Sequence, residues 1–196
     1  MKYEEYLKKT ELSKLELIAL TWGSLIDDLP KEGIPALPGP PFLMVDRIVE
    51  VSHNGAKGRI VGEQDISLDQ WFFQCHFRHD PVQPGCLGVD AIWQLIGLYE
   101  SLRGAKGTGR ALGAGEIEFL GQIRPHNRVV RYEVDIRRYV ELPASGSYLA
   151  VGTGSVIVDG ELVYKIKDAK VGAFKDLRYK DYPHCSMNAI GGQMKR

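Results

Sequence analysis

Residues 86–102 read CLGVDAIWQLIGLYESL, and they are the most informative segment for the fold. Its apolar residues recur at three- and four-residue intervals, which places them on one face of an α-helix. The residues on that face are Leu87, Ala91, Leu95, Leu98 and Leu102. Trp93 and Ile96 widen the apolar surface beyond this face. A helix that is apolar over so much of its circumference is expected to be buried on several sides, so we place it inside the domain.

Strand-like segments lie on both sides of this helix in the sequence. Two precede it, at 42–51 and 58–66, and the Asn54-Gly55 turn between them is a strong signal for a β-hairpin. Four more follow it, at residues 111–120, 129–138, 147–158 and 162–174, with Asp159-Gly160 as a second hairpin turn. Because the helix does not alternate with the strands, the pattern predicts an α+β domain, in which a mostly antiparallel sheet wraps one long helix.

The two ends of the chain differ from this body. Residues 2–28 show the helical spacing of apolar side chains, and the sequence predicts a helix there. Residues 29–42 contain five prolines, too many for a helix or a central strand, so a lead-in loop is expected. We therefore divide the chain into an N-terminal helical extension and proline-rich lead-in (1–40), the α+β domain (41–175) and a polar C-terminal tail (176–196).

The composition argues against several classes of function. The 196 residues include 25 Lys+Arg and 25 Asp+Glu, so the formal net charge is zero, whereas a nucleic-acid-binding protein usually has a basic excess. No apolar run approaches the ~18 residues of a membrane span, and the acidic N-terminus does not fit a secretion signal. Three cysteines, an odd number, favour reduced thiols. We expect a cytoplasmic protein with no nucleic-acid or membrane partner.

A candidate acid and base lie close to the start of the long helix. Asp90 is unusual on an apolar helix, because a buried carboxylate is unfavourable unless it has a partner. Gln94, four residues later, has an amide that could hold the Asp90 carboxyl. His76 lies in the loop before the helix, and a histidine side chain titrates near neutral pH. A histidine and a desolvated carboxyl together suit general base and general acid chemistry.

The first residues of the helix add a third chemical feature. Gly85 and Cys86 begin the helix, where backbone N–H groups lack intrahelical acceptors and the helix dipole is positive. Such groups can polarise a carbonyl oxygen. Combined with His76 and Asp90, they suit removal of a proton next to a carbonyl group.

Three other interpretations of this region are weaker. Zinc has possible ligands at Cys75, His76, His79, Asp80 and Cys86, but their spacing matches no paired zinc motif, so we predict no metal. Cys86 as a nucleophile would leave Asp90 unexplained. The glycine-rich residues 104–109 follow a helix rather than a strand, which favours a connecting loop over a phosphate site.

The region around the candidate site resembles a known family. The pattern WFFxCHFxxDPVxPGCLGxDAxWQL over residues 71–95 is similar to the signature of the bacterial β-hydroxydecanoyl-acyl-carrier-protein dehydratase/isomerase family. The similarity runs from about residue 41 to residue 174, and it includes GRALG at 109–113 and KVGxF at 170–174. The resemblance implies a hotdog fold, in which a curved antiparallel sheet wraps a central helix, and a homodimer that needs no cofactor.

The resemblance also implies roles for individual residues. The substrate would be a 3-hydroxyacyl group carried by the 4'-phosphopantetheine arm of acyl carrier protein. His76 of one chain would remove the C2 proton, Asp90 of the other would serve the C3 hydroxyl, and the Gly85 N–H would hold the thioester oxygen. The product would be a trans-2-enoyl thioester, which the enzyme would also isomerise to the cis-3 form. Supporting side chains near the acyl group would be Trp93, Gln94, Gln83 and Phe174.

The match has departures, and other functions remain open. Gln83 stands where the isomerising enzymes have Met, and the turn after Arg138 has fewer basic residues than the family leads us to expect. We nevertheless expect Arg137, Arg138 and Lys170 to contact the acidic carrier protein. The alternatives are a dehydratase without isomerase activity, a hotdog-fold acyl thioesterase and a non-catalytic acyl-binding module.

Overall fold

The computed structural model describes residues 1–175, so the polar tail predicted at 176–196 lies outside the described residues. The elements are, in order, α1 (Tyr3–Tyr6), α2 (Lys14–Thr21), β1 (Arg47–Asn54), β2 (Lys57–Asp65), η1 (Trp71–Gln74, a 3₁₀ turn), α3 (Gly85–Leu102), β3 (Thr108–Gly113), β4 (Glu116–Phe119), β5 (Val129–Leu142), β6 (Ser147–Val158) and β7 (Glu161–Phe174). None of the helices in this part of the chain is long and apolar enough to cross a bilayer.

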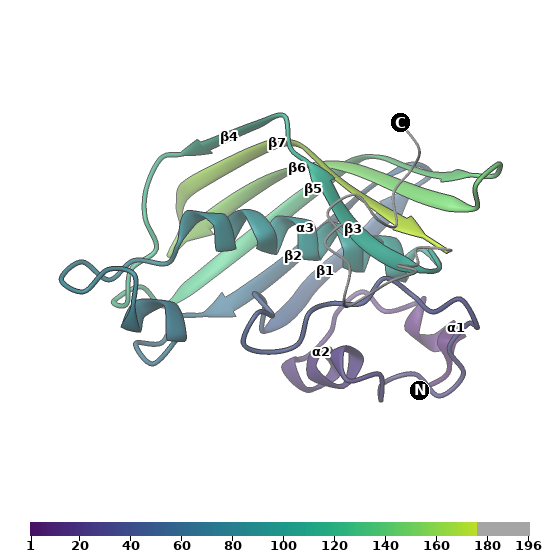
Figure 1. The fold of residues 1–196 in the computed structure, drawn as a ribbon, viewed down its shortest axis with the longest axis horizontal. Coiled ribbons are helices and arrows are strands. Elements are labelled where there is room, and N and C mark those ends of the chain that lie inside the picture. Colours follow the sequence, from purple (N-terminus) through teal and green to yellow (C-terminus); the bar gives the residue numbers. More distant parts are fainter. Residues whose placement is uncertain (176–196) are drawn as a thin grey trace, which may run out of the picture.

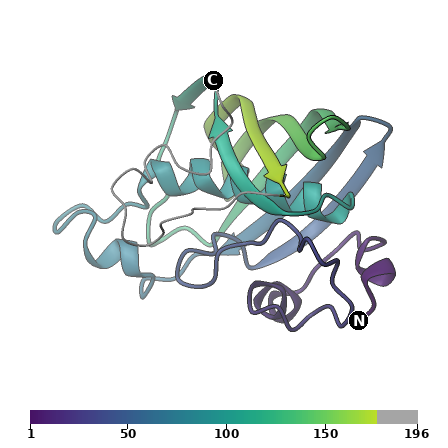
Figure 2. The same cartoon turned by 45° about the vertical axis from the view of Figure 1, so that its right-hand side comes forward.

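The strands form one seven-stranded sheet, and α3 packs against it. The strand order is β1-β2-β5-β6-β7-β3, with β4 also paired to β7, and every strand pair is antiparallel. Figure 1 shows α3 lying across the sheet, and Figure 2 shows the sheet curling around it. This arrangement is the hotdog fold, and the prediction of an α+β domain with a central helix is confirmed.

Helix α3 is enclosed as its sequence predicts. Of its 18 residues, 13 are buried. Two glycines let the helix and the sheet approach closely. A Cβ atom on Gly88 would lie 2.6 Å from the Tyr164 ring, and one on Gly154 would lie 2.7 Å from Ile92. Because real Cβ contacts are never that short, larger residues at these positions would push the helix away from β6 and β7.

The sheet bends where irregularities in two strands, β5 and β7, line up. Arg137 of β5 is an extra residue between the pairs Ile136–Gly152 and Arg138–Val151. The register of β7 on β6 also shifts at this level, where Asp168 has a positive φ of 53°. Arg137 and Asp168 form an ion pair between the two irregular sites. Since a bulge bends a strand and increases its twist, aligned bulges explain the curl around α3.

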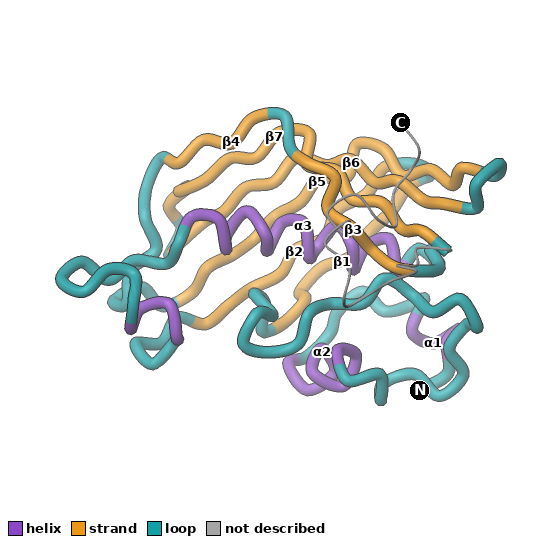
Figure 3. Tube along the Cα trace, in the orientation of Figure 1, coloured by secondary structure: helices purple, strands orange, loops and turns teal. Residues whose placement is uncertain are grey.

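The N-terminal region differs from the single helix predicted over residues 2–28. Two short helices, α1 and α2, occur there instead (Figure 3). Ser13 ends the intervening stretch and begins α2 through a reciprocal cap with Glu16. Just before it, Leu12 pairs with Ile48 through two backbone hydrogen bonds of 3.0 and 2.8 Å, which attaches this segment to the free edge of β1. The local cap and the available strand edge therefore override the helical spacing.

The strand predicted over residues 111–120 is also wrong in its extent. The structure divides it into β3 and β4, which pair with different parts of β7. Gly113 has a positive φ of 136°, a conformation that favours glycine and interrupts the strand. The two hairpin turns at Asn54-Gly55 and Asp159-Gly160 are confirmed.

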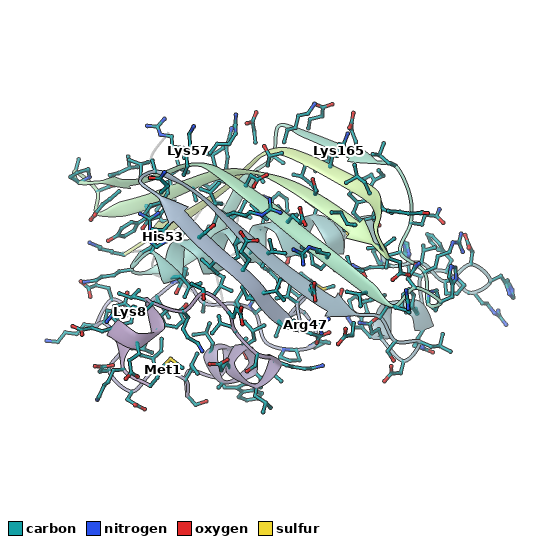
Figure 4. All side chains as sticks on the ribbon, turned by 180° about the vertical axis from the view of Figure 1, so that it is seen from behind. Met1, Lys8, Arg47, His53, Lys57 and Lys165 are labelled. Atoms are coloured by element: carbon teal, nitrogen blue, oxygen red, sulfur yellow. The ribbon has the colours of Figure 1, made fainter. Side chains whose placement is uncertain are left out.

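Ion pairs cover the outer face of β1, β2 and β5, the side seen in Figure 4. Three arginines carry the network. Arg47 pairs with Glu63 and Asp65, Arg131 with Glu63 and Glu133, and Arg59 with Glu133 and Asp135. Exposed pairs of this kind contribute little stability each, so the core packing around α3 remains the main stabilising feature.

A buried carboxyl lies near the end of α3. Glu100 is fully buried, and within the described residues neither carboxyl oxygen has a hydrogen-bond partner. Burial raises the pKa of Glu100 to about 8, because the ionised form would lose its hydration; the nearby Ala150 backbone offsets only part of this rise. Glu100 is therefore protonated in the folded protein near neutral pH.

Glu100→Gln should stabilise the protein increasingly as the pH rises. The ordinary glutamate pKa is 4.5, so between pH 4.5 and about 8 the unfolded chain ionises at this residue while the folded chain stays protonated. Wild-type free energy of unfolding then falls by about 1.4 kcal/mol per pH unit from this group alone. Urea denaturation at pH 5 and pH 8 measures the difference. The exposed control Glu161→Gln should show none, and an equal gain from Glu100→Gln at both pH values would contradict the assignment.

Candidate active site

The loop between η1 and α3 places His76. Phe72 and Phe73 anchor η1 in the core. The His76 backbone N–H donates to the Phe72 carbonyl at 2.9 Å, and the Val82 N–H donates to the His76 carbonyl at 2.8 Å. These bonds close the loop on itself, so the position of His76 is held by buried residues on one side and by the start of α3 on the other.

The hydrogen bond of the His76 ring determines which ring nitrogen is free. Nδ1 lies 3.0 Å from the Val82 carbonyl oxygen. A carbonyl oxygen can only accept, so Nδ1 carries the proton, and Nε2 has the lone pair when the ring is neutral. His76 is half-buried, and its Nε2 atom has the lone pair that a general base requires.

Gln94 holds the Asp90 carboxyl, as the four-residue spacing predicts. Gln94 Nε2 donates to Asp90 Oδ2 at 2.6 Å and to the Phe42 carbonyl at 2.9 Å. Its Oε1 accepts from the Met44 N–H at 3.0 Å. The amide is therefore fixed by the backbone of residues 42–44, and through it the orientation of Asp90 is fixed as well.

The environment of Asp90 favours its protonated form. Burial raises the pKa of the Asp90 carboxyl above its ordinary value, because the ionised form would lose hydration, and the hydrogen bond from Gln94 opposes only part of this rise. A raised pKa keeps the proton on a larger fraction of Asp90 near neutral pH than on an exposed aspartate. Asp90 can therefore act as a proton donor.

The first turn of α3 begins after Pro84 and presents backbone N–H groups. Pro84 is the N-cap residue, and its side chain has no hydrogen-bonding group to satisfy the N–H groups of the first turn. A Cβ atom on Gly85 would lie 2.5 Å from the Phe119 ring. Glycine at this position therefore lets β4 approach the helix terminus and leaves the Gly85 backbone uncovered by a side chain of its own.

A cavity of about 980 Å³ opens at this end of α3. Residues from the His76 loop, from one face of α3, from β4 and the segment after it, and from β7 line it. They are His76, Val82, Gln83, Gly85, Cys86, Val89, Trp93, Ile117, Phe119, Leu120, Gly121, Gln122, Arg124 and Tyr164. Its size and largely apolar lining suit a small-molecule ligand with an extended apolar group.

The cavity gathers some of the predicted site residues and leaves others out. His76, Gln83, Gly85, Cys86 and Trp93 line it. The remaining three lie elsewhere: Asp90 and Gln94 face the segment at residues 42–44, and Phe174 ends β7. No hydrogen bond joins Asp90 to His76 among the described residues.

The sequence pattern does not predict the β4 wall of the cavity. Ile117, Phe119 and Leu120 form much of it, yet in the protomer their exposed fractions are 41, 57 and 57%. The one signal in the sequence is the alternation of apolar residues with Glu116 and Glu118 between the glycines at 115 and 121, a pattern typical of an ordinary strand. Arg124 also lines the cavity and pairs with Asp80 at 2.7 Å, a contact that sequence spacing does not predict.

The basic residues expected to contact the carrier protein lie on the outer side of the sheet. Arg138 and Lys170 both pair in register with Val151, so they flank it on the same face, and both are exposed. Arg137 is also exposed but is paired with Asp168. Arg138 and Lys170 thus form a pair of cations with no ion-pair partner among the described residues.

Residues 1–175 hold no cluster of three His, Cys, Asp or Glu side chains arranged to bind a metal ion. Cys75 and Cys86 are exposed thiols outside any disulfide. Cys86 and His76 both line the cavity, but no hydrogen bond joins them in the described structure.

Known structures resemble this chain at low sequence identity. A dehydratase heterocomplex, ApeI:P from Xenorhabdus doucetiae, is 14% identical with a TM-score of 0.54, over 68% of this chain and 84% of that chain. The PaaI protein of the E. coli phenylacetic acid degradation operon is 11% identical with a TM-score of 0.45, over 59% of this chain and 72% of that chain. A hypothetical thioesterase from Streptococcus pneumoniae is 15% identical with a TM-score of 0.44, over 64% of this chain and 83% of that chain.

The first of these, with a TM-score above 0.5, shows likeness of fold alone. The sequence match to a family is more specific. The FabA-like domain matches residues 37–167, which is more than half of the 196-residue chain and includes the His76 loop, α3 and the β4 wall. The chain therefore belongs to the FabA-like domain family.

Proposed function

We propose that the protein is a 3-hydroxyacyl-[acyl-carrier-protein] dehydratase that forms trans-2-enoyl thioesters. The observation that carries the proposal is the His76 ring, whose Nδ1 is fixed on the Val82 carbonyl, beside the Gly85 terminus of α3 in a largely apolar cavity. Membership of the FabA-like family supports a thioester substrate on a carrier protein.

The proposed reaction uses these groups in turn. His76 Nε2 takes the C2 proton, and the negative charge that develops on the thioester oxygen is stabilised by the Gly85 N–H, with the Cys86 N–H beside it. The C3–O bond then breaks as the Asp90 carboxyl donates its proton, so that the hydroxyl leaves as water and a C2=C3 double bond forms. The proton on His76 is released and Asp90 is reprotonated before the next turnover.

A homodimer would bring the acid and the base together. Asp90 and its Gln94 partner do not line the protomer's own cavity, and the β4 wall exposes Ile117, Phe119 and Leu120. A second copy packed against this wall would cover the apolar side chains and contribute its own Asp90. Each active site would then contain His76 of one protomer and Asp90 of the partner subunit.

His76→Ala and Asp90→Asn should each lower dehydration of 3-hydroxydecanoyl carrier protein by at least ~10²-fold, the usual effect of losing a positioned base or acid. Both variants should elute as wild-type dimers in size-exclusion chromatography. Near-wild-type turnover in both would contradict the roles given to the two residues.

Mixed dimers test whether the site is shared. The two variants, co-expressed with different tags and purified through both, would pair His76→Ala with Asp90→Asn. One of the two sites then keeps an intact His76 and an intact Asp90, and activity should return to about half that of the wild type. If both groups acted within one protomer, the mixed dimer would stay as inactive as its parents.

We propose that Arg138 and Lys170 guide the acidic carrier protein. Arg138→Glu with Lys170→Glu should raise KM for carrier-bound substrate several-fold at low salt and leave KM for a small pantetheine thioester unchanged, because opposite charges mainly speed the encounter between proteins. The control Lys8→Glu with Lys31→Glu makes the same charge change at exposed N-terminal positions. Equal KM changes for both substrates, or in both double variants, would argue against a docking role.

We further propose that the enzyme moves the double bond from trans-2 to cis-3. The base that starts dehydration can also remove a C4 proton if the bent acyl chain brings C4 within about 3 Å of His76 Nε2. The charge again develops on the thioester oxygen, and the proton returns at C2. The identity of residue 90 supports the proposal. Related dehydratases without isomerase activity resemble this chain but have Glu at this position, whereas this chain has Asp90.

Chromatography of products from trans-2-decenoyl carrier protein tests the isomerase activity. We expect cis-3-decenoyl product, and its yield should rise with Gln83→Met, since a buried amide near the acyl chain disfavours apolar groups that a thioether accepts. If wild type and Gln83→Met both yield only trans-2 and 3-hydroxy species, the isomerase proposal is wrong and the protein is a dehydratase without isomerase activity.

A further inference from the structure

Gln83 belongs to a buried chain of polar groups beside the cavity. Its side chain is 2% exposed, its backbone N–H donates to the Ile123 carbonyl at 2.9 Å, and it lines the cavity. Gln83 Nε2 lies 3.4 Å from the Tyr132 hydroxyl, which in turn donates to Gln64 Oε1 at 3.0 Å. Tyr132 of β5 and Gln64 of β2 are themselves buried.

The direction of these hydrogen bonds leaves one acceptor unused. Tyr132 has a single hydroxyl proton, which it gives to Gln64, so it can only accept from Gln83. Gln83 therefore has its NH₂ group on Tyr132, and its Oε1 atom is buried with no donor within the described residues. A buried carbonyl oxygen without a donor is unfavourable, and such groups in proteins normally have a partner.

Several other polar side chains of the cavity already have partners. Gln122 Oε1 accepts from Arg124 at 2.5 Å, and Arg124 also pairs with Asp80. The His76 ring donates to Val82. No described side chain, Tyr164 and Cys86 of the cavity lining included, donates to Gln83 Oε1. The molecule that enters the cavity can therefore supply the missing donor.

We propose that Gln83 makes this cavity select acyl groups that carry a hydroxyl group further along the chain than C3, in preference to plain alkyl chains. The proposal rests on the proposed function, which places an acyl thioester in this cavity. The terminal torsion of a glutamine side chain has a broad energy minimum, so a small rotation turns Oε1 toward a ligand hydroxyl. A chain of methylenes that reaches Gln83 leaves the oxygen unpaired, whereas a hydroxyl on the chain supplies the donor.

Binding measurements on unreactive analogues test the proposal. The probes are decanoyl pantetheine with an amide in place of the thioester, and its isomers that carry one hydroxyl at a position from C4 to C10. Isothermal titration calorimetry gives the dissociation constant of each for wild type and for Gln83→Met. For at least one isomer, we expect the affinity ratio of hydroxylated to plain chain to fall by about tenfold in Gln83→Met, the usual effect of losing a buried hydrogen bond.

Gln122→Met is the matched control. It also replaces a cavity amide by a thioether, but at a residue whose oxygen already has Arg124 as its donor. We expect it to change the affinities of plain and hydroxylated chains by similar factors. A change of the ratio in Gln83→Met alone supports the proposal, and the same ratio in wild type and Gln83→Met overturns it.

The dehydratase assay on the same wild-type preparation distinguishes failure of the selectivity proposal from failure of the proposed function. If 3-hydroxydecanoyl carrier protein is dehydrated but the affinity ratio does not depend on Gln83, the selectivity proposal alone is wrong. If the carrier-bound substrate is not dehydrated and no amide analogue binds, the proposed function is wrong and the selectivity proposal is overturned with it.

Discussion

The burial of α3 within the curved sheet governs how the other elements are arranged. The helix is apolar on nearly every side, so it requires strands around it, and Gly88 and Gly154 allow the close approach that encloses it. The aligned irregularities at Arg137 and Asp168 bend the sheet to match. Apolar contact and close packing thus determine where both ends of the helix lie.

The site follows from where α3 begins. The first turn of the helix cannot satisfy its own N–H groups, and the sheet does not close over it, so a cavity remains at that end. His76 reaches the cavity because its loop is tied to η1 and to Val82. Asp90, about one turn further along, is directed to a different side by Gln94. One helix therefore supplies two parts of the proposed chemistry to two different surfaces.

Three buried polar side chains near α3 differ in how many of their polar atoms form hydrogen bonds. Gln94 uses both ends of its amide, and it positions Asp90. Gln83 uses only its NH₂ group, and Glu100 uses neither carboxyl oxygen. Satisfied groups of this kind make a structure specific, whereas an unsatisfied one is unfavourable unless a proton or a ligand relieves it. For Glu100 the proton does so, and for Gln83 we propose that a ligand does.

Periodicity and local spacing in the sequence predict the central helix, the α+β class, both hairpin turns and the contact of Asp90 with Gln94. The sequence predicted His76 and Asp90 as a pair but not that only His76 lines the protomer's cavity. The split of residues 2–28 into two helices, the break at Gly113 and the β4 wall depended on pairing between distant segments. Strand edges, bulges and cavities arise from contacts between residues far apart in the chain, and local patterns contain no information about which edge or face will be free.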